Sequence, residues 1–380
     1  MRLAKRVFLS PPHCTTLEMD YVRDAIESNW IAPAGPHLRQ FEEEICACAG
    51  MSSACALSSG TAGVHLALKA LGVGRGDLVF CSDLTFAGSV NPVFYEGAQA
   101  VLIDSAPYSC NLDPSALALA LEDAASRRKL PKALIAVDLY GHPADWNTIL
   151  PLCQSYNVPV IEDAAEALGA FAGGKACGSF GAIGVFSFNG NKIITSSGGG
   201  MVVSNDAALI KKINFWANQS KENAPYYLHN EIGYNYRMSN ICAAIGRAQL
   251  ASLDTRIARR KQIFEAYKAA FADLPVRMLE PVAHTAPNHW LSVMLLESDA
   301  PRTAAQVVQS LEADNIEARR AWNPMHCQPV FAHCGYICAQ ERSMSEDFFA
   351  HGICLPSGSG MTDGEQNEVI SRVRALCATK

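Results

Sequence analysis

The residue that most clearly indicates chemistry in this chain is a single lysine, Lys192. It follows the strand-like residues 186–188 and precedes a loop of small residues that leads into a second apolar run, 201–203. An ammonium group held at a sheet edge in a packed core loses hydration, which favours the neutral, nucleophilic amine. Such an amine can hold an aldehyde cofactor through a Schiff base. Taken alone, the spacing also fits an ordinary loop lysine.

An acidic residue ends the strand-like run upstream of this lysine. Residues 158–163 have the pattern of a buried parallel strand that ends in Asp163. Sites collect at the carboxyl ends of such strands in α/β sheets. A carboxylate there can pair with a protonated pyridine nitrogen and so make pyridoxal phosphate (PLP) an electron sink. The spacing between Asp163 and Lys192 leaves room for a short crossover and one further strand.

A short polar turn between a strand and a helix is the third candidate element. An apolar strand pattern over 54–57 is followed by a turn at 58–61 and then by a helical pattern. Such a turn presents backbone N–H groups at a helix N-terminus, which can bind a phosphate group without any lysine. The alternative is a plain helix cap by Ser59 or Thr61.

In sequence order, these three elements are the phosphate turn, the pyridine acid and the Schiff-base lysine of a PLP enzyme. With them, the chain resembles the nucleotide-sugar aminotransferases of the DegT/DnrJ/StrS family, which are fold-type I PLP enzymes. The resemblance covers nearly the whole chain, and its most specific parts are the Lys192 segment and Gly-Tyr-Asn-Tyr-Arg at 233–237. The other segments that carry it are 9–13, 28–36, 83–86, 238–240 and 324–331.

The resemblance implies a role for each site residue. Lys192 is implied to be the catalytic residue, which holds the cofactor's aldehyde and moves the proton between cofactor and substrate. Asp163 is implied to pair with the pyridine nitrogen, and Phe86 to stack on the ring. Asn235 is implied to reach the cofactor of a neighbouring subunit, so that a homodimer shares its active sites. The residues implied to hold the phosphate within one subunit are Gly60, Thr61 and Ser187.

Three further residues are assigned by the same resemblance. Glu166 stands where many relatives carry glutamine or histidine near the cofactor's phenolic oxygen. A carboxylate there would repel a phenolate, so either Glu166 turns away or this subfamily differs. Trp30 and His326 are implied to contact the substrate.

The order of apolar patterns predicts an α/β fold with a largely parallel central sheet flanked by helices. Strand patterns at 78–81, 100–104 and 133–137 alternate with helical patterns such as 113–126 and 145–156. This alternation implies a parallel sheet that is covered on both faces.

Length and patterning suggest two domains, as in fold-type I transferases. The 380 residues with 49% apolar content exceed one ordinary core. A long helix over 239–270 is expected to link the two parts. We expect a large PLP-binding domain at 1–250 and a smaller C-terminal α+β domain at 251–380.

Charge and hydropathy exclude several classes of partner. The net charge is −6 and no basic stripe is present, so we expect no nucleic-acid binding. No run approaches about 18 apolar residues, the length needed to cross a membrane, and no apolar signal core follows the start. We therefore expect no membrane association and a cytoplasmic location.

The fourteen cysteines are scattered, and many lie in apolar runs, so they are interpreted as buried, reduced thiols. Histidines and cysteines do gather near the C-terminus, where a zinc site must be considered. No paired Cys-x-x-Cys occurs there and the spacing is irregular, so we expect no metal site. The members of this group are His326, Cys327, His333, Cys334, Cys338, His351 and Cys354.

Rival classes can be compared on the same residues. A nicotinamide-dependent enzyme needs Gly-x-Gly-x-x-Gly after an early strand, and the nearest match, 72–76, follows a helix and precedes a strand. A non-catalytic regulator on this scaffold would lose Lys192 or Asp163. The related PLP-dependent sugar dehydratases carry histidine in place of the lysine, so Lys192 argues against them.

The sequence therefore predicts a PLP-dependent aminotransferase that acts on a nucleotide-linked keto sugar. By resemblance, the donor is L-glutamate and the substrate is UDP-4-keto-6-deoxy-N-acetylglucosamine, aminated at C4 for a surface glycan or glycoprotein. The alternative is another keto sugar, such as the substrates of GDP-perosamine or dTDP-amino sugar synthesis.

Overall fold

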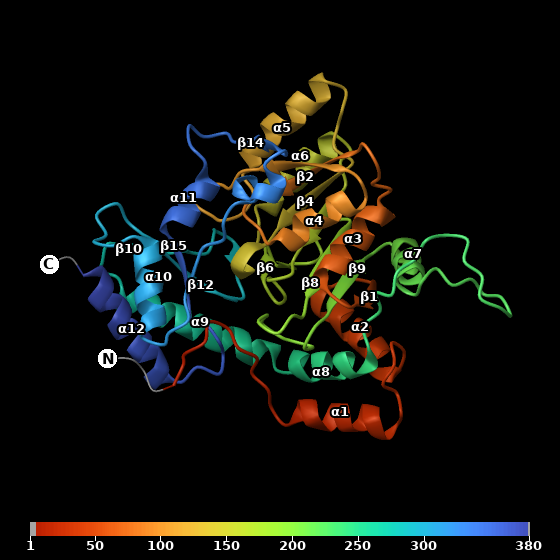
Figure 1. The fold of residues 1–380 in the computed structure, drawn as a ribbon, viewed down its shortest axis with the longest axis horizontal. Helices are drawn as coiled ribbons and strands as arrows, with labels where there is room; N and C mark the ends of the chain where they lie inside the picture. Colours follow the sequence, from red (N-terminus) through yellow and green to blue (C-terminus); the bar gives the residue numbers. More distant parts are fainter. Residues whose placement is uncertain (1–4, 379–380) are drawn as a thin grey trace.

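An eight-stranded sheet forms the centre of the protein in the computed structural model, which describes residues 5–378 (Figure 1). β1 and β8 run antiparallel to β9, which lies between them, whereas every other neighbouring pair is parallel. The predicted α/β class and largely parallel sheet are thus confirmed. In spatial order the strands are β1 (Ser53–Leu57), β9 (Gly200–Ser204), β8 (Ile183–Ser187), β5 (Val160–Asp163), β4 (Ala133–Val137), β2 (Leu78–Ser82), β3 (Gln99–Ile103) and β14 (Gly335–Ile337).

Helices cover both faces of this sheet because alternate strand residues point to opposite sides. Ile135 of β4 packs in one core with α3, α4 and α7, whereas its neighbours Leu134 and Ala136 pack in another with α5 and α6. Asp113 and Asp145 cap α5 and α6, and both helices lie where the sequence predicts them. The bounds are α1 (Leu17–Glu27), α2 (Pro36–Ala49), α3 (Gly60–Ala70), α4 (Ala87–Tyr95), α5 (Pro114–Ser126), α6 (Trp146–Ser155) and α7 (Ala207–Ala217).

The prediction of a single long helix over 239–270 is wrong. The structure has two helices here, α8 (Asn240–Leu250) and α9 (Leu253–Ala270). At the break, the backbone N–H of Ser252 donates to the carbonyl of Gln249 at 3.1 Å, and its hydroxyl donates to the same oxygen at 2.9 Å. A serine side chain that competes for a backbone carbonyl in this way interrupts the helical ladder.

The C-terminal part contains a four-stranded antiparallel sheet packed against helices, at the left of Figure 1. β14 leaves this region and joins the large sheet beside β3. The division of the chain at residue 250 stays a prediction. The elements are β10 (Val276–Met278), β12 (Ser292–Leu296), β15 (Gly352–Leu355) and β13 (Arg319–Arg320), with α10 (Ala304–Ala313), α11 (Met344–His351) and α12 (Asp363–Cys377).

The remaining strands form a small three-stranded sheet, β11 (Thr285–Ala286), β6 (Phe171–Ala172) and β7 (Lys175–Ala176). Within residues 5–378, every helix is too short or too polar to cross a membrane.

Candidate active site

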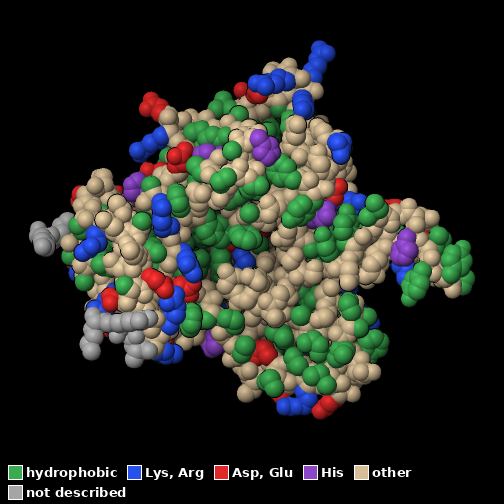
Figure 2. Space-filling model, viewed as in Figure 1, with side chains coloured by type: hydrophobic (Ala, Val, Ile, Leu, Met, Phe, Trp, Pro, Cys, Tyr) green, Lys and Arg blue, Asp and Glu red, His purple; other side chains and the backbone are tan. Residues whose placement is uncertain are grey.

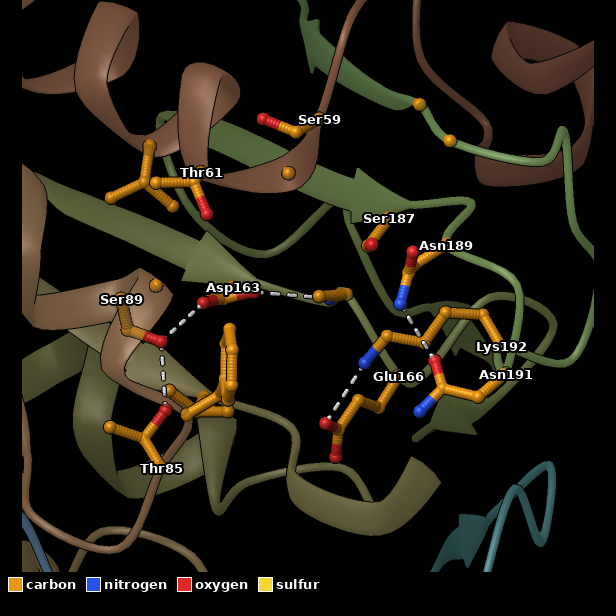
Figure 3. A pocket seen from close by; sticks show the side chains of 18 of the residues that line it. Ser59, Thr61, Thr85, Ser89, Asp163, Glu166, Ser187, Asn189, Asn191 and Lys192 are labelled. Carbon is orange, nitrogen blue, oxygen red and sulfur yellow. Dashed lines mark hydrogen bonds and ion pairs between the residues drawn. The ribbon is translucent and has the colours of Figure 1, made fainter. Parts of the chain in front are cut away.

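A cavity of about 480 Å³ opens at the carboxyl ends of the parallel strands. Parallel strands end at the same edge of a sheet, so loops that are distant in sequence meet there. Most of the predicted site residues line this cavity, and Figure 3 shows several of them facing a common space. The predicted residues brought together are Gly60, Thr61, Phe86, Asp163, Glu166, Ser187 and Lys192.

Asp163 is the last residue of β5 and is buried. Its Oδ2 accepts a hydrogen bond from the Ser89 hydroxyl at 2.6 Å, and that hydroxyl lies 2.7 Å from the hydroxyl of Thr85. Burial raises the pKa of Asp163, and the hydrogen bonds from Ser89 and from the backbone N–H of Ala165 oppose this rise. The carboxylate is thus fixed in position, and within residues 5–378 no cation forms an ion pair with it, which suits it to a protonated ring nitrogen.

Lys192 reaches into the cavity from the loop after β8, and its side chain is 11% exposed. Its Nζ donates to Oε1 of Glu166 at 3.0 Å (Figure 3). The same atom lies 4.2 Å from the centroid of the Trp290 ring. The side chain is largely buried, as the sequence suggests, and it has a carboxylate partner that the sequence pattern did not indicate. A protonated amine is not a nucleophile, and Glu166 is the carboxylate placed within hydrogen-bond distance to accept a proton from it.

Glu166 is held between this lysine and the backbone. Its Oε2 accepts from the N–H of Tyr140 at 2.7 Å. Burial raises the pKa of Glu166, while the charge of Lys192 and the hydrogen bond from Tyr140 lower it. The carboxylate is thus directed toward Lys192, and how it lies relative to the cofactor's phenolic oxygen stays a prediction.

The turn at Gly60 and Thr61 forms the N-terminus of α3. Ser59 caps this helix by accepting from the N–H of Ala62 at 3.1 Å, so the cap foreseen as an alternative is present. The first N–H groups of a helix have no partner within it and are available to a phosphate group. A Cβ at Gly88 would lie 2.8 Å from the Thr61 hydroxyl oxygen, which leaves no room for a side chain beside the turn.

Phe86 directly precedes α4, and its ring is 62% exposed. The ring lies 5.8 Å from that of Trp322, with a tilt of 58° between the planes. An aromatic side chain that is exposed on a cavity wall offers a free face for stacking on a planar ring.

Several cavity residues were not predicted as site residues. Thr85 and Ser89 follow the carboxyl end of β2, so the signal that identified Asp163 applies to them too. Trp290 and Trp322 come from the C-terminal part, and no local pattern in the sequence marks them.

Two predicted residues lie outside the cavity wall that the described residues form. Asn235 is exposed, and its Oδ1 accepts from Nε2 of Gln219 at 3.0 Å. Trp30 is 48% exposed, and its carbonyl accepts from Nδ2 of Asn240 at 2.7 Å. Their proposed roles require substrate or a second subunit and stay predictions.

His326 also lies away from this wall, in the short 3₁₀ turn Met325–Cys327. Its Nδ1 is 2.7 Å from Oδ2 of Asp83, and its Nε2 is 3.2 Å from Oε1 of Glu346. Donor atoms of His326, Cys327 and Glu346 lie within 4.8 Å of one another, although Glu346 was not among the residues considered for a metal. The expectation of no metal site stays a prediction.

The pH dependence of stability provides a test of the His326 contacts. Burial lowers the pKa of His326, but the hydrogen bonds and charges of Asp83 and Glu346 outweigh it, so the pKa is raised. This contribution to stability is present below the unfolded-state value of 6.5 and is lost as the pH rises through the folded value. We expect the melting temperature of the wild type to fall relative to that of His326→Gln as the pH rises above 6.5. Parallel curves for the two proteins would contradict this assignment.

PLP fits the residues of this cavity. The cofactor has an anionic phosphate, a ring nitrogen that can be protonated and an aldehyde. The cavity offers the N-terminus of α3, the buried carboxylate of Asp163 and the primary amine of Lys192. The fold and this set of groups are those of a PLP-dependent enzyme.

Comparison with known proteins gives the family. Residues 12–374 match the DegT/DnrJ/EryC1/StrS aminotransferase family. EpsN of Bacillus subtilis, whose name places it among the PLP-dependent aminotransferases, is 50% identical over 368 residues, which cover 96% of this chain and 94% of EpsN. GDP-perosamine synthase of Caulobacter vibrioides is 37% identical and covers 96% of this chain and 97% of its own. The chain therefore belongs to the DegT/DnrJ/EryC1/StrS aminotransferase family and is a PLP-dependent sugar aminotransferase.

A solved structure agrees with this assignment. The DegT/DnrJ/EryC1/StrS aminotransferase from Brucella abortus has a TM-score of 0.88 and 26% sequence identity, and the match covers 96% of each chain.

Proposed function

We propose that the protein transfers an amino group from L-glutamate to C4 of UDP-4-keto-6-deoxy-N-acetylglucosamine, a nucleotide-linked keto sugar. One observation supports an amino-transfer site above all others. The amine of Lys192 lies inside a cavity that also contains the buried carboxylate of Asp163 and the start of α3. The family resemblance supports the choice of donor and sugar.

The residues of the chain have distinct tasks in this reaction. When bound, PLP supplies an aldehyde that takes up the amino group and a ring that spreads negative charge. Asp163 holds a proton on the ring nitrogen, because a buried carboxylate is stabilised by a cation placed against it. Thr61 and the first N–H groups of α3 orient the cofactor's phosphate.

Lys192 moves the proton at the reacting carbon. Its Nζ must be neutral to accept a proton, and Oε1 of Glu166, 3.0 Å away, is placed to take the proton that the ammonium gives up. Burial raises the pKa of Glu166, which makes its carboxylate a better proton acceptor than an exposed one. We therefore assign Glu166 a role in positioning Lys192 and in setting its protonation.

A second candidate substrate is a GDP-linked 4-keto sugar. The 37% identity to a GDP-perosamine synthase over nearly the whole chain favours it. Turnover of a panel of UDP-, GDP- and dTDP-linked keto sugars with glutamate distinguishes the candidates. Selective turnover of the UDP sugar supports the first proposal, and selective turnover of the GDP sugar replaces it with the second.

We also propose that two subunits share each active site. The segment that follows α7 projects from the body of the protein at the right of Figure 1, and Figure 2 shows apolar side chains at its tip. Tyr226, Tyr227 and Ile232 in this segment are 65%, 80% and 79% exposed. Exposed apolar side chains of this kind are typical of surfaces that bind a partner. Asn235 lies where the segment returns to the body, in an antiparallel bridge with Asn218 at the end of α7, and we propose that it enters the site of the second copy.

A mixing experiment tests the shared site. Lys192→Ala and the double variant Asn235→Ala, Tyr236→Ala are each expected to be inactive alone. After subunit exchange, one site in each mixed dimer has both an intact lysine and an intact donated segment, so activity should partly return. The measurement is transamination before and after exchange, with exchange verified by affinity tags. No recovery after verified exchange, or a fully active monomer, would contradict the proposal.

The cytoplasmic location expected from the sequence stays a prediction.

A further inference from the structure

Two side chains contact the amine of Lys192. Oε1 of Glu166 lies 3.0 Å from Nζ (Figure 3), and the centroid of the Trp290 ring lies 4.2 Å from the same atom. The carboxylate is buried, and so is the ring, since Trp290 is 2% exposed. A cation is attracted both by a carboxylate and by the negative face of an indole ring, and both attractions are stronger where water is excluded. Together, the two partners therefore suit a lysine that carries a proton.

The side-chain amide of Asn288 holds these two partners at a fixed spacing. Its Nδ2 donates to the backbone carbonyl of Glu166 at 2.8 Å, and its Oδ1 accepts from the backbone N–H of Trp290 at 2.8 Å. Asn288 is buried, and its amide packs so closely on Gly141 that no room is left there for a Cβ. Both partners of the lysine thus belong to one hydrogen-bonded unit.

The ring of Trp290 is also tied to the loop that carries the lysine. Its Nε1 donates to the carbonyl of Asn191 at 2.7 Å, and the hydroxyl of Ser10 donates to the same oxygen at 2.7 Å. The carbonyl of Trp290 accepts from Nη1 of Arg260, a buried residue of α9. The orientation of the ring relative to Lys192 is therefore set by hydrogen bonds as well as by packing.

An aminotransferase needs its lysine in two conditions. The nitrogen is bonded to the cofactor's aldehyde carbon when the cofactor is PLP, and it is free when the cofactor is in its amino form, pyridoxamine phosphate (PMP). A free ammonium has three N–H donors, whereas the nitrogen of a Schiff base has at most one. Only the free ammonium can donate to Glu166 and direct another N–H toward the ring of Trp290 at the same time.

We propose that Glu166 and Trp290 form a docking position for the free ammonium of Lys192, and that this position favours PMP over PLP. Trp290 acts as a positioning residue for Lys192 through the face of its indole ring. No new covalent step is involved, because the docking position concerns only where the lysine lies when it is not bonded to the cofactor. This inference goes beyond the proposed function, since it holds for any amino donor and any keto sugar.

Competition between the two forms of the cofactor measures this preference. The PLP-loaded enzyme is dialysed against mixtures of PLP and PMP, and the absorbance of the enzyme gives the fraction that carries each form. Contacts that both forms make alike cancel, so the exchange constant reports the cost of moving the lysine from its docking position. We expect Trp290→Leu to shift this constant toward PLP by about fivefold to thirtyfold, the range for a desolvated cation–π contact. An exchange constant equal to that of the wild type would overturn the proposal.

Trp290→Phe is the matched control for the loss of volume. Phenylalanine and leucine are both smaller than tryptophan, and both lack the N–H that donates to Asn191, but only phenylalanine has an aromatic face. We expect the exchange constant of Trp290→Phe to stay within about threefold of the wild type. Equal shifts in the two variants would assign the effect to lost packing and overturn the proposal.

Fluorinated tryptophans at position 290 test the same contact while the side chain keeps its shape. Each added fluorine withdraws charge from the ring face but leaves the indole N–H in place, so the attraction for a cation weakens stepwise. We expect the exchange constant to move toward PLP with each fluorine, and this series gives the answer if Trp290→Leu fails to fold. No trend along the series would contradict the docking position.

A tryptophan elsewhere in the chain provides a control outside the site. The ring of Trp216 on α7 lies 5.2 Å from Nζ of Lys69 and 5.1 Å from Nζ of Lys212, and it is not part of the cavity wall. We expect Trp216→Leu to leave the exchange constant unchanged. A shift as large as that of Trp290→Leu would show a general effect of losing a buried tryptophan and overturn the proposal.

Reaction with glutamate gives a second measurement of the same preference. In Trp290→Leu, the ratio of glutamate to 2-oxoglutarate that converts half of the cofactor to PMP should rise by the factor found in the competition experiment. Absence of this rise would count against the docking position. A wild-type enzyme that does not react with glutamate would instead contradict the proposed donor, and the competition between PLP and PMP would still decide this inference.

Discussion

Replacing Lys192 with alanine is expected to abolish transamination, with a loss of about a thousandfold or more in kcat. The change removes the amine that holds the cofactor and moves the proton, and it leaves Glu166 buried without its cation. Wild-type protein should be yellow, and borohydride should attach the cofactor covalently to Lys192. Absorbance spectra during reaction with glutamate give the measurement.

Lys192→Arg is the control for the ion pair. Arginine keeps the positive charge beside Glu166 but stays protonated, so it cannot act as a nucleophile. We expect it to preserve the melting temperature better than alanine does and to be equally inactive. Full activity in Lys192→Ala would remove the lysine from the mechanism.

The second large effect is expected at Asp163. Asp163→Ala leaves the ring nitrogen of the cofactor without its anionic partner, so the ring accepts negative charge less well. We expect a loss of about 10²-fold or more in rate, which corresponds to roughly 2.7 kcal/mol of transition-state stabilisation. The rate of a single turnover with glutamate, at saturating cofactor, is the measurement.

Asp163→Asn separates charge from shape at this position. Asparagine retains an oxygen that can accept from the Ser89 hydroxyl, so the pocket should stay formed. It carries no negative charge, and we therefore expect nearly the same loss of rate as with alanine. A rate within about threefold of the wild type in both variants would show that Asp163 is only a structural residue at the strand end.

The parts of the site that follow local patterns could be predicted from sequence. Asp163 and the turn at Gly60 lie at strand ends, and the sheet topology alone brings such ends to one edge. The order of strands and helices was also predictable. Short apolar runs that alternate with capped helices are compatible with few folds, chiefly a parallel sheet covered by helices.

Other features depend on contacts between distant segments. Trp290 and Trp322 enter the cavity only through the packing of the C-terminal part, which no short pattern encodes. The pairing of Glu166 with Lys192 depends on side-chain directions in two separate loops. The break between α8 and α9 depends on one serine hydroxyl that competes for a carbonyl, an effect too small to override the helical pattern in a sequence.

The position of β14 has a consequence for how the protein is made. This strand, Gly335–Ile337, covers the edge of β3, and the N–H of Asp104 donates to the carbonyl of Ile337 at 3.0 Å. During synthesis, β3 is complete more than two hundred residues before β14 leaves the ribosome. An uncovered strand edge is a template for pairing with other chains. A chain that stops short of residue 335 would therefore be prone to aggregate, although every residue that faces the cofactor would already be present.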